Sequence, residues 1–119
     1  YILGAGLLTK LVGTGYETSV SSVALVKQRT VEPAALIASP LALVLCGDQI
    51  QDPRNIGVLV RTAEAAGCSG VLLSASSADP WSRQAVRSTT GSLLRVPLCL
   101  AQNLSQTLHT LRERGALIV

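Results

Sequence analysis

From Gly47 to Gly67 the sequence reads GDQIQDPRNIGVLVRTAEAAG, and this stretch carries the plainest structural signals of the chain. Asp52 suits a helix N-cap, because its carboxylate accepts hydrogen bonds from backbone N–H groups of the first turn. Pro53 suits the first helical position, where its missing N–H costs nothing. Gly67 suits the left-handed residue that ends many helices. The stretch therefore predicts a helix from about Pro53 to Ala66.

Two polar residues of this helix, Asn55 and Arg61, are not needed to form it. In one interpretation Arg61 pairs with Glu64, three residues further on, and Asn55 lies in a solvated first turn. In the other interpretation both side chains point into a site at the strand-to-helix edge, where ligands of open α/β sheets bind. The residue types alone leave both interpretations open.

Apolar runs and helical segments alternate on either side of this helix. The run Leu41–Cys46 is continuous, which is typical of a strand buried on both faces. The connections are short enough to require right-handed crossovers between parallel strands. We therefore predict an α/β fold, a parallel sheet with helices on both faces. The expected strands are 41–46, 70–74, 95–100 and 116–119, and the further expected helices are 81–89, begun by Asp79-Pro80, and 103–114, capped by Asn103 and ended by Gly115.

The first 40 residues are less regular. Residues 7–12 have helical spacing, and residues 23–27 suit a strand. Residues 31–40 contain two prolines and are typical of a linker. The sequence begins with Tyr1 and stops inside an expected strand, so we expect an internal part of a longer protein. The expected units are residues 1–30, which end a preceding domain, a linker at 31–40, and the α/β domain at 41–119.

The composition excludes several classes of protein. Apolar residues make up 48% of the 119 residues and charged residues 14%, which excludes a disordered tail. The net charge of +3 is compatible with an anionic partner but is no nucleic-acid signature by itself. No apolar run reaches the roughly 20 residues that span a bilayer. Cys46, Cys68 and Cys99 lack CxxC spacing, so we expect small buried side chains, no metal, and a reducing cytoplasm.

The sequence from residue 43 to residue 67 resembles motif 1 of the SpoU (TrmH-like) branch of the SPOUT RNA methyltransferases. That motif is an apolar strand, an acidic turn, Asp-Pro-x-Asn-x-Gly, and then Arg followed by small residues and Gly. The matching residues here are Leu43–Cys46, Asp48, Asp52, Pro53, Asn55, Gly57, Arg61 and Gly67.

A second stretch, residues 85–92 followed by Val96-Pro97-Leu98, resembles motif 2 of the same family. Gly91 is retained, whereas Thr89 replaces the usual Ser and Ser92 replaces the usual Ala. The two motifs together cover residues 41–119. Residues 7–28 more loosely resemble the end of the RNA-binding domain that precedes the catalytic domain in many members.

The resemblance implies a SPOUT-type α/β knot fold and transfer of a methyl group from S-adenosylmethionine to a ribose 2′-hydroxyl of rRNA or tRNA. Motif 3, which supplies most of the cofactor pocket and completes the knot in the family, is not in this sequence. We therefore expect most cofactor contacts to lie outside residues 1–119, and no measurable S-adenosylmethionine binding by these residues alone. Family members are homodimers, which implies a homodimer here. A non-catalytic RNA-binding homologue of the same fold is the alternative, and an intact or degraded motif 3 distinguishes the two.

The resemblance also implies roles for individual residues. The family's motif 1 Arg activates the 2′-hydroxyl. Because a guanidinium almost never gives up a proton, we favour Arg61 as the catalytic group that stabilises developing negative charge and anchors a phosphate. Asn55 is the second catalytic candidate, and it hydrogen-bonds the ribose or orients Arg61. Glu64 holds the guanidinium group of Arg61 in place. Gly57 allows the close approach of a helix or of the cofactor.

Three further arginines are candidates for RNA binding. Arg83 and Arg87 are four residues apart and share one helix face, where they clamp RNA phosphates or form an ordinary solvated surface. Arg54 lies beside the expected site. Trp81 either stacks on a base or anchors the packing of a helix start. His109, between leucines, has a structural role.

Overall fold

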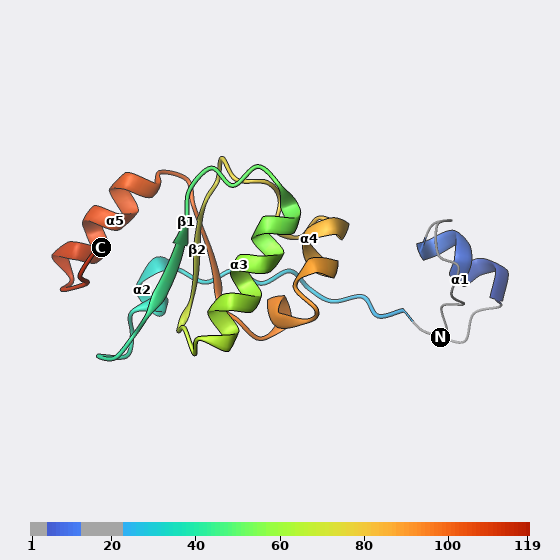
Figure 1. Ribbon diagram of the computed structural model, residues 1–119, viewed down its shortest axis with the longest axis horizontal. Helices are drawn as coiled ribbons and strands as arrows, with labels where there is room; N and C mark the ends of the chain where they lie inside the picture. Colours follow the sequence, from blue (N-terminus) through green and yellow to red (C-terminus); the bar gives the residue numbers. More distant parts are fainter. Residues whose placement is uncertain (1–4, 13–22) are drawn as a thin grey trace.

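The core of the fold is a parallel three-stranded sheet (Figure 1). The computed structural model describes residues 5–12 and 23–119. The strands are β1 (Val44–Gly47), β2 (Gly70–Ser74) and β3 (Leu98–Ala101), in the order β1-β2-β3. Val44 lies opposite Gly70 in the first pair, and Val71 lies opposite Leu98 in the second. The predicted α/β class is confirmed.

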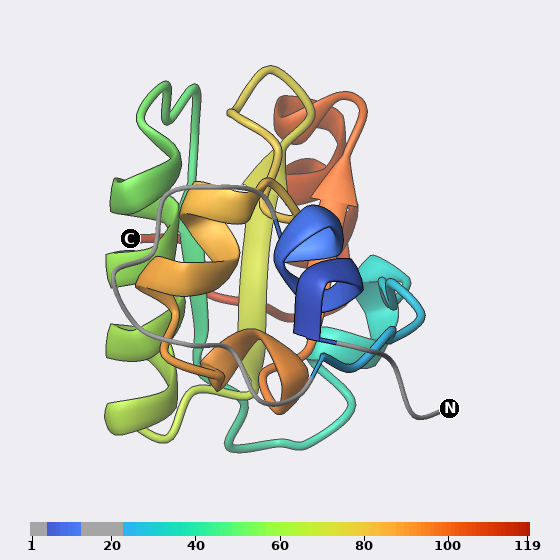
Figure 2. The same ribbon diagram turned by 90° about the vertical axis from the view of Figure 1, so that its right-hand side faces the viewer.

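Helices cover both faces of this sheet (Figures 1 and 2). The helices α3 (Pro53–Ala65) and α4 (Arg83–Ser88) lie side by side on one face, followed by the short 3-10 helix η1 (Ser92–Leu94). The helices α2 (Pro33–Leu36) and α5 (Leu104–Glu113) cover the other face. Because β1 to β2 and β2 to β3 step in the same direction, right-handed crossovers place α3 and α4 on a common face.

Alternate side chains of β2 pack into two hydrophobic cores, one on each face of the sheet. Val71 and Leu73 face α3 and α4, whereas Leu72 faces α2 and α5. The first core also contains Ile56, Val60, Ala63, Leu93, Val96 and Leu98, and the second contains Leu36, Cys99, Ala101 and Leu111. Both clusters are buried, so β2 is covered on both faces, as the central strand of such a sheet must be.

The predicted caps of α3 are confirmed. The Asp52 carboxylate accepts a hydrogen bond from the backbone N–H of Arg54 at 2.8 Å, and Pro53 holds the first helical position. Gly67 follows the helix with a φ of 68°, in the left-handed region. In α5 the Asn103 side chain accepts from the backbone N–H of Gln106 at 3.0 Å, and Gly115 has a φ of 94°.

Two element boundaries differ from the prediction. The second helix begins after Ser82, whose hydroxyl accepts from the Ala85 N–H at 3.3 Å, because the Asp79 carboxylate caps only the turn at Trp81. The third strand begins at Leu98 instead of residue 95, because the chain first forms η1.

The first predicted strand is shorter and less buried than expected. It begins at Val44, and Leu41, Leu43 and Cys46 are exposed, because in the described part of the chain β1 pairs on one edge only. Cys99 is buried as predicted, Cys68 is half-buried, and Cys46 contradicts the prediction. Although the Cys46 side chain is exposed to solvent, its thiol is partly desolvated, and this effect, followed by the charge of Asp48, raises the pKa of the thiol.

The predicted strands at 116–119 and 23–27 are absent from the described residues. Residues 116–119 turn back after α5, with the Ala116 N–H donating to the Leu111 carbonyl at 3.1 Å, and they have no strand partner. Residues 23–30 are extended and exposed. The helical spacing of residues 7–12 is confirmed by α1 (Ala5–Val12).

The segment expected to be a linker packs against the sheet. The Val31 N–H donates to the Leu98 carbonyl at 2.8 Å, and Leu36 of α2 is 1% exposed. The division of the chain into three units stays a prediction, and parts of its first unit, residues 1–4 and 13–22, lie outside the described residues. Over the ranges 5–12 and 23–119, no helix has both the length and the apolar character of a membrane span.

Candidate functional site

The two sequence motifs meet where α3 contacts α4. A Cβ atom on Gly57 would lie 2.2 Å from Ser88 Cβ and 2.8 Å from the Ser88 carbonyl carbon. Real Cβ atoms do not approach other carbons so closely, so only glycine permits this helix contact. Gly57 belongs to motif 1 and Ser88 to motif 2. The close approach predicted for Gly57 is therefore made by a helix.

The turn after α4 is built from left-handed residues and an internally satisfied hydroxyl. Thr90 and Gly91 have φ values of 49° and 93°. Thr89 is buried, and its hydroxyl donates to the Val86 carbonyl at 2.7 Å. A serine could make the same bond, which explains why threonine is tolerated where the family has serine. Thr89 thus holds the turn in place.

Glu64 bonds to Arg95 and not to Arg61, which corrects the predicted pairing. The Arg95 Nη2 lies 2.9 Å from Glu64 Oε2, and the Arg95 Nε donates to Oε1. The bonds from Arg95, and after them the Ser92 hydroxyl, lower the pKa of Glu64 to about 2. No local sequence pattern points to Arg95 as this partner, because it lies 31 residues from Glu64.

Arg61 is exposed on α3, and among residues 5–12 and 23–119 it has no ion-pair partner. Arg54 precedes it by seven residues, which is about two helical turns, so the two lie on one face roughly 10 Å apart along the axis. The Arg54 Nη2 is 2.9 Å from Asp52 Oδ2. Bonding from Arg54 lowers the pKa of Asp52. The positive charge of Arg61 is therefore less neutralised by acidic neighbours than the charge of Arg54.

Asn55 and Arg61 do not share a face of α3. Asn55 is exposed in the first turn, and six residues of a helix place it about 120° around the axis from Arg61. The predicted orientation of Arg61 by Asn55 is therefore not supported by the helix geometry. Asn55 lies near the carboxyl edge of the sheet, whereas Arg61 lies further along the α3 surface.

A serine network fixes the start of α3. The Ser74 hydroxyl accepts from the Gln49 N–H at 2.8 Å, and the Ser77 hydroxyl accepts from the Ile50 N–H at 3.1 Å. The Gln51 side-chain amide donates to the Ser76 carbonyl at 3.1 Å. These bonds join the loops that follow β1 and β2 and so set the entry of α3. No pattern in the sequence distinguishes these serines from those of an ordinary polar loop.

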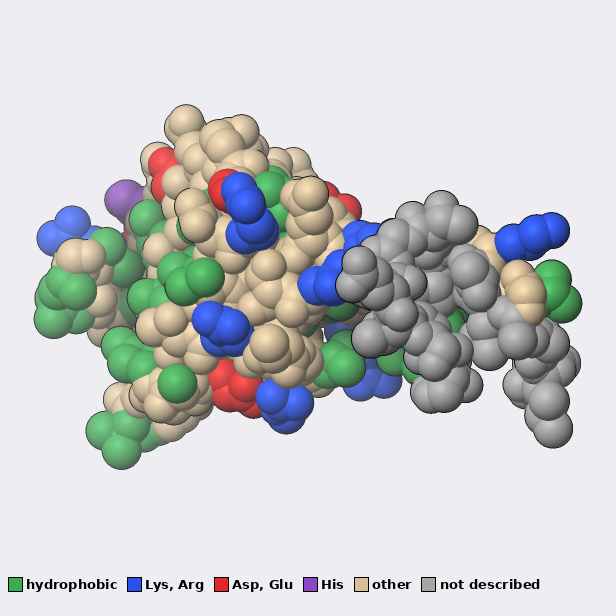
Figure 3. Space-filling model, turned by 45° about the vertical axis from the view of Figure 1, so that its right-hand side comes forward, with side chains coloured by type: hydrophobic (Ala, Val, Ile, Leu, Met, Phe, Trp, Pro, Cys, Tyr) green, Lys and Arg blue, Asp and Glu red, His purple; other side chains and the backbone are tan. Residues whose placement is uncertain are grey.

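Arg83 and Arg87 are exposed on α4, one turn apart, and each interacts with another part of the protein. Figure 3 brings forward the side of the molecule that carries α3 and α4, and several Lys and Arg side chains are spread over it, some beside acidic side chains. The candidates for RNA contact, Arg54 on α3 and Arg83 and Arg87 on α4, thus belong to the two helices on one face of the sheet.

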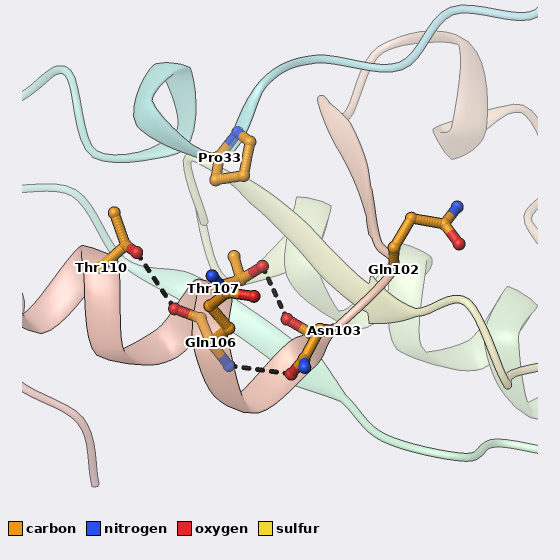
Figure 4. A pocket seen from close by; sticks show the side chains of 6 residues that line it. All are labelled: Pro33, Gln102, Asn103, Gln106, Thr107 and Thr110. Carbon is orange, nitrogen blue, oxygen red and sulfur yellow. Dashed lines mark hydrogen bonds between the residues drawn. The ribbon is translucent and has the colours of Figure 1, made fainter.

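Two cavities lie on the other side of the sheet. One is a polar pocket of about 310 Å³ at the start of α5 (Figure 4). Its hydroxyls bond back to α5, with Thr107 Oγ1 donating to the Asn103 carbonyl at 2.9 Å and Thr110 Oγ1 to the Gln106 carbonyl at 3.1 Å. The second is an apolar groove of about 560 Å³ between β1 and α5, and it is closed by residues 116–119.

Neither cavity suits S-adenosylmethionine by itself. The polar pocket has amides and hydroxyls, the groove is lined mainly by aliphatic side chains with Arg114, and neither has a carboxylate for the cationic groups of that molecule. Residues 5–12 and 23–119 also hold no group of three His, Cys, Asp or Glu side chains placed to bind a metal.

Of the two remaining candidates, Trp81 packs against the core, whereas His109 lies on the surface. Trp81 is partly buried and packs against the core under α3, which supports the packing interpretation. His109 is exposed on α5, with Nδ1 3.5 Å from Glu113 Oε1 one turn further on.

Comparison with known proteins agrees with these features. The SpoU rRNA Methylase family matches residues 42–119. The chain is 32% identical over 80 residues to the putative TrmH family tRNA/rRNA methyltransferase YacO of Bacillus subtilis (strain 168), covering 67% of this chain and 31% of that protein.

Solved structures show the same likeness. An AdoMet-bound rRNA methyltransferase from Sinorhizobium meliloti superposes with a TM-score of 0.66 at 32% identity, covering 72% of this chain and 33% of that one. An RNA 2′-O ribose methyltransferase superposes with a TM-score of 0.58 at 28% identity, covering 77% and 32%. The chain thus spans about a third of the length of these proteins.

Proposed function

The chain belongs to the SpoU rRNA methylase family, and we propose that the full-length protein transfers a methyl group from S-adenosylmethionine to a ribose 2′-hydroxyl of rRNA or tRNA. The observation that carries the proposal is the contact between Gly57 and Ser88, which joins the two motifs beside an exposed Arg61. The names of the relatives, RNA methyltransferases with AdoMet-bound members, support the same reaction.

S-adenosylmethionine supplies an electrophilic methyl group, so the residues of the chain have to position the ribose and stabilise charge. A hydroxyl oxygen that attacks carbon becomes more negative as it loses its proton, and a nearby fixed cation stabilises that charge. Arg61 is such a cation, and its guanidinium keeps its own protons. We assign it to stabilisation of the oxygen and to anchoring of an adjacent phosphate. Asn55, at the edge of the sheet, is placed to hydrogen-bond a ribose or base rather than to orient Arg61.

Arg54, Arg83 and Arg87 are proposed to bind RNA phosphates. Their exposure on α3 and α4, around Arg61, supports this role. Phosphate contacts fix the position of a nucleic acid without reading its sequence. Replacing one of them should therefore weaken binding to different RNAs alike and reduce its dependence on salt.

The deciding experiment is transfer of labelled methyl groups from S-adenosylmethionine to total RNA by the full-length protein. We expect label on ribose 2′-oxygens and a loss of about 10²- to 10³-fold in Arg61→Ala, the size seen when one oxyanion-stabilising donor is removed. Arg112→Ala, an exposed arginine of α5, is the matched control and should retain the rate. Label on a base, or an unchanged rate in Arg61→Ala, would contradict the proposal.

The non-catalytic alternative has a different outcome in the same experiment. A full-length protein that is folded and binds RNA, but transfers no label to unmodified RNA, would identify an RNA-binding homologue. The cofactor needs this full-length test as well, because neither the polar pocket nor the apolar groove described above suits it.

We also propose a cytoplasmic homodimer. Members of the family build their active site at a two-fold interface, and the groove beside β1 shows that this part of the chain has apolar surface to bury. Light scattering of the full-length protein at assay concentration should give twice the mass of one chain. A monomeric mass in an active preparation would contradict the dimer.

A further inference from the structure

Arg61 has a potential acidic neighbour on its own helix. Glu64 follows it by three residues, and side chains at that spacing lie about 5–6 Å apart at Cβ. A carboxylate paired with Arg61 would neutralise the cation that the proposed function needs. In this structure the pair does not form, because Glu64 bonds elsewhere.

Arg95 holds the Glu64 carboxylate with two parallel bonds. The Nη2 bond is 2.9 Å long, and Nε donates to the other carboxylate oxygen. Such a forked arginine–carboxylate pair is the stronger and more directional kind. The buried Ser92 hydroxyl also helps to lower the pKa of this carboxylate. Together these bonds draw the Glu64 side chain toward η1 and away from Arg61.

The Arg95 guanidinium lies beside the turn at Gly91. A Cβ atom on Gly91 would lie 3.4 Å from Arg95 Nη1, so the guanidinium lies directly over the turn. The φ of 93° at Gly91 is a conformation that favours glycine. The motif 2 turn therefore contacts the Arg95 guanidinium, and motif 2 also contacts α3 through Ser88 of α4.

We propose that Arg95 is a positioning residue that sequesters the Glu64 carboxylate and so leaves Arg61 available to an anionic group of the RNA. The part that concerns activity rests on the proposed function, because it takes Arg61 as the substrate-facing cation. The part that concerns Glu64 is a property of the protein alone. The prediction that distinguishes this role from a structural one is epistasis: removing Glu64 should rescue the loss of Arg95.

The activity test uses the full-length protein and three variants. Arg95→Gln should lower kcat/KM by about 2- to 5-fold, the range of an exposed ion pair formed between Glu64 and Arg61. Glu64→Gln should leave kcat/KM near its original value, and the double variant should return to that value. Arg112→Gln is the matched control. A double variant that is as slow as Arg95→Gln would overturn the proposal, because a bridge that only holds α3 to η1 is lost equally in both.

A second measurement needs no activity. The carboxyl carbon of Glu64 is followed by NMR while pH is lowered, in full-length protein with ¹³C-labelled glutamate. In the Arg95→Gln background, adding Arg61→Gln should raise the pKa of Glu64, because Arg61 has become its partner. In the protein that retains Arg95, Arg61→Gln should change the pKa of Glu64 far less. If Arg61→Gln has the same small effect in both backgrounds, Arg95 does not keep the two apart.

The two measurements separate the failure of this inference from the failure of the proposed function. An inactive full-length protein in which the NMR coupling appears only after loss of Arg95 supports sequestration and contradicts the methyl-transfer proposal. Methyl transfer that depends on Arg61 but shows no epistasis between Arg95 and Glu64 supports the methyl-transfer proposal and contradicts sequestration. Thermal unfolding of each variant confirms that it is folded before either measurement is made.

Discussion

At the scale of single residues, Gly57 sets the distance between α3 and α4. We predict that Gly57→Ala destabilises the protein by about 1–3 kcal/mol, the usual cost of overpacking a tight contact. The reason is that the new Cβ would lie 2.2 Å from Ser88 Cβ and 2.8 Å from the Ser88 backbone. Denaturant unfolding measures the loss. Thr62→Ala, exposed on the same helix, is the control and should change the free energy by less than about 0.5 kcal/mol.

Residue-level prediction from the sequence succeeded where the cause is local. Asp52, Pro53 and Gly67 act on backbone groups within four residues, so their types reveal their roles. The pairing of Arg61 with Glu64 failed for the opposite reason. Helical spacing identifies possible partners on one helix, whereas the actual partner of Glu64 arrives from a different element and forms two bonds.

At the scale of elements, the Glu64–Arg95 bridge joins α3 to η1 and makes this connection sensitive to acid. The pKa of Glu64 is about 2, below the ordinary value of roughly 4.3 that it regains on unfolding. A carboxyl whose pKa is lowered by folding stabilises the native state fully above its unfolded pKa, and this contribution is lost as pH falls toward the folded pKa.

We therefore predict that Glu64→Gln is less stable than the original protein above about pH 5, and that the difference shrinks as pH falls from about 4.5 to 2. Unfolding midpoints in denaturant, measured at pH values from 7 to 2, test this. A difference that stays constant over the whole range would show that the charge of Glu64 is irrelevant and that only its shape matters.

The elements themselves could be predicted to different degrees. Helices α3 and α5 carry capping residues at both ends, and their bounds were predicted to within a residue or two. The start of β3 could not be predicted from the sequence. Apolar residues such as those at 93 and 96 are expected both in a strand and, as in this structure, around a 3-10 helix that packs against the core. The start of α4 was predicted at residue 81, two residues too early, because Asp79 caps only a turn and Ser82 caps the helix.

At the scale of the whole molecule, the alternation of strand and helix was enough to predict a parallel sheet covered on both sides. The sequence could not show that residues 31–36 belong to the second core. Pro33 and the later Pro40 are typical of a linker, and only the packing of Leu36 against Leu72 and Cys99 reveals the connection. The candidate site was likewise predicted as residues but not as an arrangement, since Asn55 and Arg61 prove to lie on different sides of α3.

The groove beside β1 leads to a prediction for the 119-residue chain as a whole. It is lined by aliphatic side chains of β1, α5 and residues 116–119, and Leu117 at its rim is 86% exposed. Contiguous apolar surface of this kind promotes association in water. We expect light scattering to give a mass above 12.4 kDa that rises with concentration.

The position of the apolar surface decides between two explanations of such association. If the groove is responsible, Leu117→Gln should lower the mass at a given concentration, because it places a polar amide at the rim. Leu94→Gln is the matched control, since Leu94 is 64% exposed on η1, across the sheet from the groove, and should have little effect. Equal effects of the two variants would mean that general hydrophobicity drives the association. A mass of 12.4 kDa at all concentrations would show that the groove does not promote contact between chains.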